Sequence, residues 1–150
     1  MGQSLASLLV HIVFSTKNRQ PLITPDLEPE LHAYLGGVCK ELHSPALAIN
    51  GYTDHVHLLC SLSKTMALAE LLRKVKAHSS TWAKRKGRAH GNFAWQDGYS
   101  AFSIGQSGVP ALMRYIESQK NRHRRVGYQE ELRSFFKKYG VAFDERYVWA

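Results

Sequence analysis

Two histidines separated by one apolar residue are the side chains of this sequence best suited to chemistry. His55 and His57 lie in the run DHVHLLCSL, residues 54–62, whose Val and Leu content favours a β-strand. Side chains alternate between the two faces of a strand, so both imidazoles point to one side while Val56 and Leu58 point to the other, where they can pack on helices. Two adjacent imidazoles form half of a divalent metal site. The sequence therefore predicts that another element supplies the missing ligand.

The stretch YIESQ offers that missing half. Ser107, Gly108 and Pro110 indicate the start of a helix over residues 109–122, on which Tyr115 and Gln119 lie one turn apart on the same face. The Gln119 amide oxygen can bind a divalent ion, and the Tyr115 phenol can attack a phosphodiester. A phenol has an ordinary pKa of about 10, so this attack requires a metal that polarises the phosphate.

Apolar periodicity and turn residues predict the elements that must position these side chains. Strands and helices alternate along the chain, which predicts an α+β fold with a largely antiparallel sheet and helices on one face, related to ferredoxin-like folds. The apolar tail, residues 143–149, is expected to dock on the domain or on a partner subunit. The predicted elements are a strand at 4–15, a helix at 24–42, hairpin strands at 46–50 and 55–62 joined by the four-residue connection GYTD, a helix at 66–86, short strands or one bent strand at 93–96 and 99–105, and helices at 109–122 and 129–138.

Length and composition set the broad class of the chain. With 150 residues, 44% hydrophobic and 21% charged, we expect a single globular domain over residues 1–150. Cys39 and Cys60 are the two cysteines and form no CxxC pair, so neither a disulfide framework nor a thiolate zinc site is predicted. A reducing cytoplasm fits this usage, and we expect no targeting or membrane-spanning segment.

The charge of the chain predicts a polyanionic partner. The formal net charge is +8, and residues 64–90 hold eight Lys or Arg against one acid, Glu70, while residues 120–125 add four bases and no acid. A membrane surface is the poorer alternative, because the apolar stripe of the 66–86 helix is no larger than a core needs. The aromatic side chains Trp82, Trp95, Tyr99 and Phe102 can stack on unpaired bases or belong to the core. The predicted nucleic-acid-binding residues are Arg73, Lys74, Lys76, Lys84, Arg85, Lys86, Arg88, Lys120, Arg122, Arg124 and Arg125.

Four stretches together carry a family resemblance. HVH at 55–57, YIESQ at 115–119, the opening HIVFSTKNRQPLI and the segment WQDGYSAFSIGQS resemble the HUH single-tyrosine transposases of bacterial insertion sequences and of repetitive extragenic palindromes. The resemblance extends over roughly residues 8–126. It implies a ferredoxin/RRM-like HUH endonuclease fold, metal ligation of Mg²⁺ or Mn²⁺ by His55, His57 and Gln119, and a nucleophilic Tyr115.

The resemblance also implies a reaction and partners. The expected reaction is cleavage and rejoining of single-stranded DNA beside a hairpin through a 5′-phosphotyrosine and a free 3′-OH, in a bacterial cytoplasm near the nucleoid. Such transposases form homodimers, often with the tyrosine helix of one subunit serving the histidine pair of the other. Whether Tyr115 acts within its own chain stays open at this point.

Two other functions remain open from sequence. One is a non-catalytic module, a domesticated relative that binds structured DNA or RNA, and the other is a metal hydrolase with an HxH site. The hydrolase is less favoured because such sites need further His or Asp ligands close by, and Leu58, Leu59 and Cys60 follow the pair. Tyr99 is a rival nucleophile with no ligand after it at helical spacing. The remaining histidines are predicted to have surface or core roles: His11, His32, His43, His78, His90 and His123.

Overall fold

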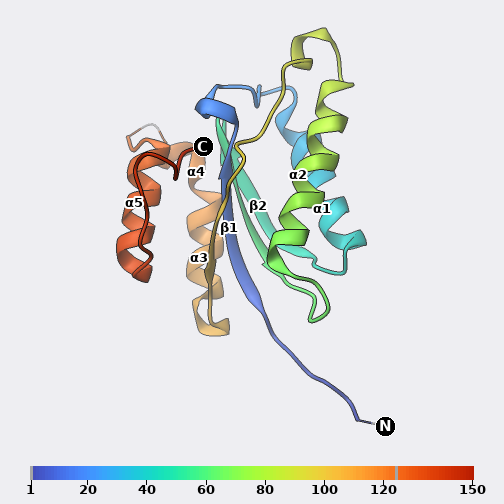
Figure 1. The fold of residues 1–150 in the computed structure, drawn as a ribbon, viewed down its shortest axis with the longest axis vertical. Coiled ribbons are helices and arrows are strands. Elements are labelled where there is room, and N and C mark those ends of the chain that lie inside the picture. The colour runs from blue at the N-terminus through green and yellow to red at the C-terminus, as the bar shows by residue number, and fades with distance from the viewer. Residues whose placement is uncertain (1, 124) are drawn as a thin grey trace.

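Four antiparallel strands form a single sheet in the order β2-β3-β1-β4 (Figure 1). The computed structural model describes residues 2–123 and 125–150. Along the chain the strands are β1 (Leu9–Ser15), β2 (Ala46–Tyr52), β3 (His55–Ser61) and β4 (Ser100–Ser103). The central strands, β1 and β3, are paired along their full length, from Leu9 opposite Ser61 to Ser15 opposite His55. The predicted α+β class and antiparallel sheet are confirmed.

Helices cover both faces of this sheet, so the expectation that they lie on one face is wrong (Figure 1). The two faces bury separate clusters because β1 and β3 carry apolar side chains on both sides. Val13 of β1, for example, is fully buried against Leu132 and Phe136 of the last helix. One face packs on α1 (Glu28–Glu41) and α2 (Leu68–Lys84), and the other lies under α3 (Val109–Glu117), α4 (Gln119–Arg122) and α5 (Tyr128–Tyr139).

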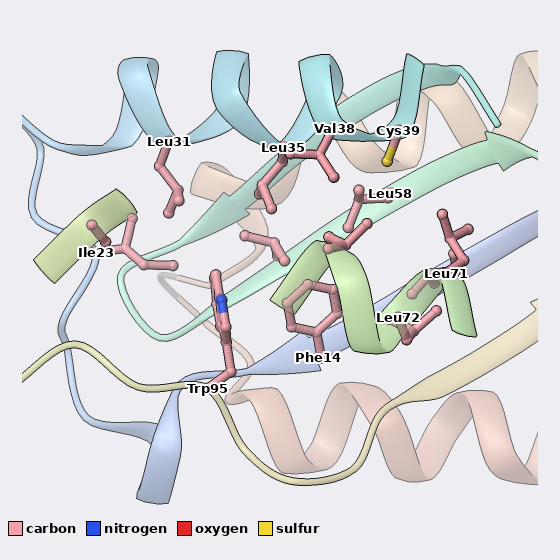
Figure 2. Close-up of a cluster of buried hydrophobic side chains, with 14 of the residues drawn as sticks. Phe14, Ile23, Leu31, Leu35, Val38, Cys39, Leu58, Leu71, Leu72 and Trp95 are labelled. Atoms are coloured by element: carbon pink, nitrogen blue, oxygen red, sulfur yellow. The ribbon is translucent and has the colours of Figure 1, made fainter. Parts of the chain in front are cut away.

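The face under α1 and α2 is the larger apolar core (Figure 2). Phe14 of β1 and Leu58 of β3 point toward Leu35 of α1 and Leu72 of α2, and all four side chains are at most 2% exposed. This is the packing expected for the alternate positions of the two central strands. The apolar side of β3 therefore fixes the strand whose other side carries the histidines.

The β2–β3 hairpin is tighter than predicted. Strand β2 continues to Tyr52, which pairs with His55, so the turn contains only Thr53 and Asp54 instead of the four residues GYTD. Gly51 makes this possible, because a Cβ at that position would collide with the backbone carbonyl oxygen of His55. The tight turn places Asp54 directly beside the first histidine.

Other predicted elements also differ from the structure, and the helices predicted at 24–42 and 66–86 are shorter, at Glu28–Glu41 and Leu68–Lys84. The first strand begins at Leu9, opposite Ser61 of β3, and not at residue 4. Of the predicted strands at 93–96 and 99–105, only β4 forms, and Trp95 makes a single bridge to Thr16. The long helix predicted over 109–122 is divided at Ser118 into α3 and α4.

The chain ends against the domain, as predicted for the apolar tail. Val148 and Trp149 pack on the cluster around Phe136, and the backbone oxygen of Ala150 accepts hydrogen bonds from the Gly98 amide and the Gln96 side chain, both at 3.0 Å. Among residues 2–123 and 125–150, no helix has the length and apolar character needed to cross a membrane.

Candidate metal and tyrosine site

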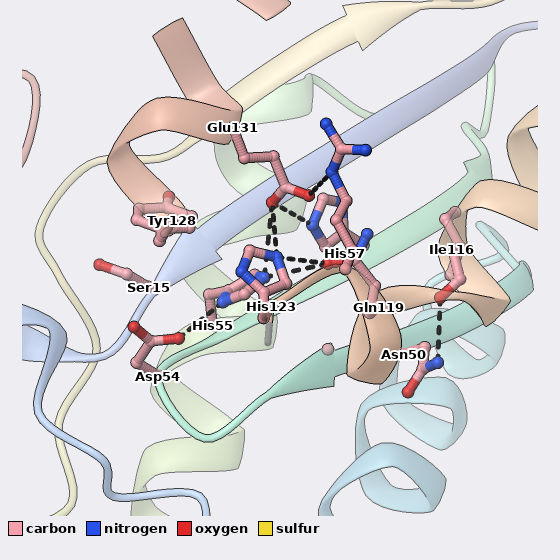
Figure 3. Close-up of polar contacts among 12 residues, drawn as sticks. Ser15, Asn50, Asp54, His55, His57, Ile116, Gln119, His123, Tyr128 and Glu131 are labelled. Carbon is pink, nitrogen blue, oxygen red and sulfur yellow. Dashed lines mark hydrogen bonds and ion pairs between the residues drawn. The ribbon is translucent and has the colours of Figure 1, made fainter. Parts of the chain in front are cut away.

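The two histidines of β3 are completely buried on the face under α3, α4 and α5 (Figure 3). Each ring is held through its Nδ1. The Nδ1 of His55 lies 2.7 Å from Oδ1 of Asp54, and the Nδ1 of His57 lies 2.8 Å from Nε2 of His11 on the neighbouring strand. Partners on Nδ1 fix the ring orientation and leave Nε2 for the site. Both Nε2 atoms therefore face the same space beneath the helices.

A break between α3 and α4 directs Gln119 into that space. The side-chain amide of Asn50 on β2 donates to the backbone carbonyl of Ile116 at 2.9 Å and to that of Glu117 at 3.2 Å. These carbonyls would otherwise accept hydrogen bonds from the next helical turn, so a side chain inserted there interrupts the helix. Gln119 follows the break and is fully buried, with Oε1 3.2 Å from Nε2 of His55.

Tyr115 also reaches the histidine pair of its own chain. Its ring centroid lies 5.8 Å from that of His57, and its hydroxyl donates a hydrogen bond to Oε2 of Glu131 on α5. The guanidinium of Arg122 lies over the Tyr115 ring, 4.9 Å from the centroid. The structure thus brings together all four residues that the sequence singled out, and the phenol is half-buried beside the cluster.

Sequence reasoning missed two members of the cluster, His123 and Glu131. Oε1 of Glu131 lies 2.9 Å from Nε2 of His57, 3.2 Å from that of His123 and 3.5 Å from that of His55. Nε2 of His123 is also 2.9 Å from Oε1 of Gln119, so the surface or core role expected for His123 is wrong. Its position four residues after Gln119 was a usable signal, whereas Glu131 has no spacing relation to the other members. His11 is buried as a core residue but contacts the site through His57.

The electrostatics of the cluster combine a charged Glu131 carboxylate with a His57 ring that is neutral at pH 7. Burial would raise the pKa of the Glu131 carboxyl, yet hydrogen bonds from His123 and His57 hold that pKa below its ordinary value, so the group is ionised at neutral pH. Burial lowers the pKa of His57 to about 4 and that of His11 to about 3. The pKa of the Tyr115 phenol is raised, first by burial and then by the nearby Glu131 carboxylate.

The donor set fits a divalent cation. His55, His57, His123 and Glu131 each offer one ligand atom, and these atoms lie within 4.8 Å of one another. In the tautomer that donates Nδ1–H to Asp54, Nε2 of His55 carries a lone pair, and this lone pair faces carboxylate and amide oxygens that also carry lone pairs. Converging lone pairs repel unless a proton or a cation lies between them, and imidazole with oxygen ligands suits several divalent ions.

The predicted nucleic-acid-binding residues fall into two separate regions. Those of the α2 region, residues 73–88, lie on the far side of the sheet from the histidines (Figure 1). Lys120 and Arg122 lie on α4 with Gln119, and Arg125 lines a surface hollow together with Arg122. Several are engaged in ion pairs, such as Lys120 with Glu28 at 2.8 Å. Arg124 lies outside the described residues.

Most of the aromatic side chains considered for base stacking belong to the core. Trp95 and Phe102 are buried, and Trp82 stacks on Tyr34 with centroids 4.9 Å apart. Tyr99 is exposed and lines a hollow of about 410 Å³ together with Arg73 and Lys76.

Comparison with known proteins identifies the family. The family model described as "Transposase IS200 like" matches residues 4–119, more than three quarters of the chain. The chain belongs to the IS200-like transposase family. Its relative ISDra2 transposase TnpA of Deinococcus radiodurans is 20% identical over 117 residues, covering 75% of this chain and 84% of that protein. Membership places the chain among enzymes of the transposase type.

Two solved structures of proteins described as transposases share the fold. A protein of Deinococcus radiodurans R1 assigned to the transposases superposes with a TM-score of 0.62 at 19% identity, covering 79% of this chain and 96% of that one. A REP-associated tyrosine transposase bound to a REP hairpin superposes with a TM-score of 0.61 at 16% identity, covering 84% of this chain and 76% of that one. At these identities the likeness concerns the fold alone.

Proposed function

We propose that this IS200-like transposase is a metal-dependent single-stranded DNA transesterase that cleaves and rejoins DNA beside a hairpin through a 5′-phosphotyrosine on Tyr115. The observation that carries the proposal is the convergence of Tyr115, Gln119 and the pair His55 and His57 within one chain. Neither a lone HxH strand nor a tyrosine on a helix would support this chemistry. The histidine pair and the tyrosine together, in a buried site with several metal-binding groups, support it.

The proposed reaction exchanges one phosphoester for another. Oη of Tyr115 attacks the scissile phosphorus, its proton leaves, and the bond from phosphorus to the 3′ oxygen breaks, so that a 3′-OH departs with a proton. The product is a 5′-phosphotyrosine, which keeps the energy of the broken bond and allows a later 3′-OH to restore a phosphodiester by the reverse exchange. No nucleotide cofactor is needed for this balance.

The metal would be Mg²⁺ or Mn²⁺, held by His55, His57 and Gln119, and when bound it would supply Lewis-acid polarisation of the scissile phosphate. The chain's own residues position the nucleophile. Glu131 accepts the Tyr115 hydrogen bond, and Arg122 covers the ring. The raised pKa of Tyr115 means that the free phenol is a weak nucleophile, so positive charge near its oxygen is required for attack.

A hollow beside the tyrosine suits an unpaired nucleotide. It measures about 340 Å³, opens between α3 and α5, and is lined by Tyr115, Phe135 and Tyr139 together with the cationic side chains of Arg122 and Lys138. Aromatic faces can stack on a base while the cations attract phosphates. Hairpin DNA is the proposed partner, supported by the net charge of +8 and by the structural relative that is bound to a REP hairpin. A homodimer remains a prediction, and the site described above needs no helix from a second subunit.

The test is covalent capture of labelled single-stranded hairpin DNA in the presence of Mn²⁺, read on a denaturing gel. The unmodified chain should form a protein–DNA adduct, and Tyr115→Phe should bind the hairpin with unchanged affinity but form none. Tyr99→Phe is the matched control, because Tyr99 is an exposed tyrosine that lines a hollow with Arg73 and Lys76 of α2, and it should retain the adduct. An undiminished adduct in Tyr115→Phe would refute the assignment, and binding without any adduct would favour the non-catalytic module.

A further inference from the structure

The carboxylate that enters the site comes from a part of the chain beyond the family match. The match to IS200-like transposases ends at residue 119, whereas Glu131 lies on α5, in the first half of the helix. Its side chain is fully buried, and it is the one carboxylate of the described residues whose oxygen lies within 3.5 Å of both His55 and His57. A buried carboxylate costs several kcal/mol of desolvation unless charged or donor groups surround it, so its position demands an explanation.

The two oxygens of Glu131 face different partners. Oε2 accepts the hydrogen bond from the Tyr115 hydroxyl and lies 3.3 Å from Nε of Arg122. Oε1 lies 2.9 Å from Nε2 of His57 and 3.2 Å from Nε2 of His123. Oε1 therefore has three imidazole nitrogens around it (Figure 3).

The distances between these donor atoms match the distances between ligand atoms around a divalent ion such as Mg²⁺. Two oxygen ligands on opposite sides of Mg²⁺ lie about 4.2 Å apart. The ligand atoms of His55, His57, His123 and Glu131 all lie within 4.8 Å of one another, and Oε1 of Gln119 is 2.9 Å from the His123 nitrogen and 3.2 Å from that of His55. Five donors thus converge on one small volume, two more than the three ligands proposed above.

We propose that Glu131, through Oε1, and His123, through Nε2, are ligands of the same divalent ion as His55, His57 and Gln119. The ion would then be held by β3, by the segment 119–123 and by α5, and Glu131 would join the ion to the nucleophile, because its second oxygen holds Tyr115. This inference rests on the proposed metal-dependent function. It makes α5 part of the site and not only a cover for the sheet.

The test is the affinity of the full chain for Mn²⁺ alone, measured by isothermal titration calorimetry and by the loss of the free-Mn²⁺ electron paramagnetic resonance signal. Glu131→Gln should bind Mn²⁺ at least about tenfold more weakly, since removal even of groups that only support ligands costs 10–100-fold. Glu130→Gln, the neighbouring exposed carboxylate of α5, is the matched control and should bind as the unmodified chain does. If Glu131→Gln fails to fold, Glu131→Asp is the second variant. It keeps the charge on a shorter side chain and should also bind Mn²⁺ more weakly than the unmodified chain.

A second readout concerns His123. Pulsed electron paramagnetic resonance of bound Mn²⁺ should show fewer imidazole nitrogen couplings in His123→Asn than in the unmodified chain. Equal Mn²⁺ affinity and unchanged couplings in the Glu131 and His123 variants, with binding lost in His57→Ala, would overturn this proposal and leave the proposed function intact. Failure of the unmodified chain to bind Mn²⁺ would overturn both, and Glu131-dependent binding without any DNA adduct would overturn the proposed function alone.

Discussion

The two faces of β3 differ in chemistry, because alternate residues of the strand are apolar on one face and histidines on the other. Val56, Leu58 and Cys60 face α1 and α2 in an apolar core, whereas His55 and His57 face α3, α4 and α5 among polar side chains. Both sets are buried. The apolar face gains stability from removing surface from water, while the histidine face must satisfy every donor and acceptor that it buries.

This difference indicates which face serves folding and which serves chemistry. Buried polar clusters contribute little net stability for their size and are demanding in geometry. The histidine face contains a phenol, a carboxylate, an amide and three imidazoles in one place, a set of groups that a core built for stability alone does not need. Packing on the apolar face fixes the position of the strand and thereby maintains the geometry of the histidine face.

Truncation on the apolar face should give the largest change in folding stability. Leu58 is 1% exposed, and Leu58→Ala is expected to lower the free energy of unfolding by about 2–5 kcal/mol through the cavity it leaves. Chemical denaturation measures this change. The increase in melting temperature on adding Mn²⁺ should be the same as in the unmodified chain. A loss of that increase would show that the two faces are not separable.

Truncation on the histidine face should instead remove the effect of the metal. His57→Ala should weaken Mn²⁺ binding at least about 100-fold, which abolishes DNA cleavage and removes most of the rise in melting temperature. At a free metal concentration 100 times the dissociation constant, that rise corresponds to about 2.7 kcal/mol in the unmodified chain. Differential scanning calorimetry with and without Mn²⁺ measures it. Cleavage that survives the substitution, or survives a chelator, would argue for metal-free chemistry.

The smallest expected effect is the pH dependence that the histidine face adds to folding stability. The pKa of His57 is about 4 in the folded chain against an ordinary 6.5, so the unfolded chain binds more protons between these values and stability falls as pH drops below 6.5. One such histidine costs about 1.4 kcal/mol at pH 5.5, and His11, with its pKa of about 3, adds a loss of the same sign.

Metal-free denaturation at pH 7.5 and 5.5 tests this dependence. His57→Gln should show a smaller loss between the two pH values, because one of the two buried rings is gone. Glu131 contributes nothing in this window, since its lowered pKa affects stability only below the ordinary carboxyl value. Equal losses in both proteins would contradict the assignment of His57 as a buried neutral ring.

Local sequence patterns predicted the strand and part of the candidate site, but not the residues that reach the site from distant elements. The alternation in HVHLLC predicted the strand and its two faces, and the four-residue spacing of Tyr115 and Gln119, together with the family resemblance, predicted their common direction. Glu131 could not be found in this way, because its contact with His57 spans 74 residues and depends on how α5 crosses the sheet. The break that directs Gln119 inward depends equally on Asn50, a residue of another strand.

The central claim is that Tyr115 forms the covalent bond with DNA, and peptide mapping of the adduct tests it most directly. The chain would be incubated with Mn²⁺ and a 3′-end-labelled single strand carrying a hairpin, then digested with trypsin and analysed by mass spectrometry. The account predicts label and nucleotide mass on YIESQK, residues 115–120, through a phosphotyrosine. Label on the peptide of Tyr99 or Tyr128, or label retained only when the 5′ end carries it, would contradict the account.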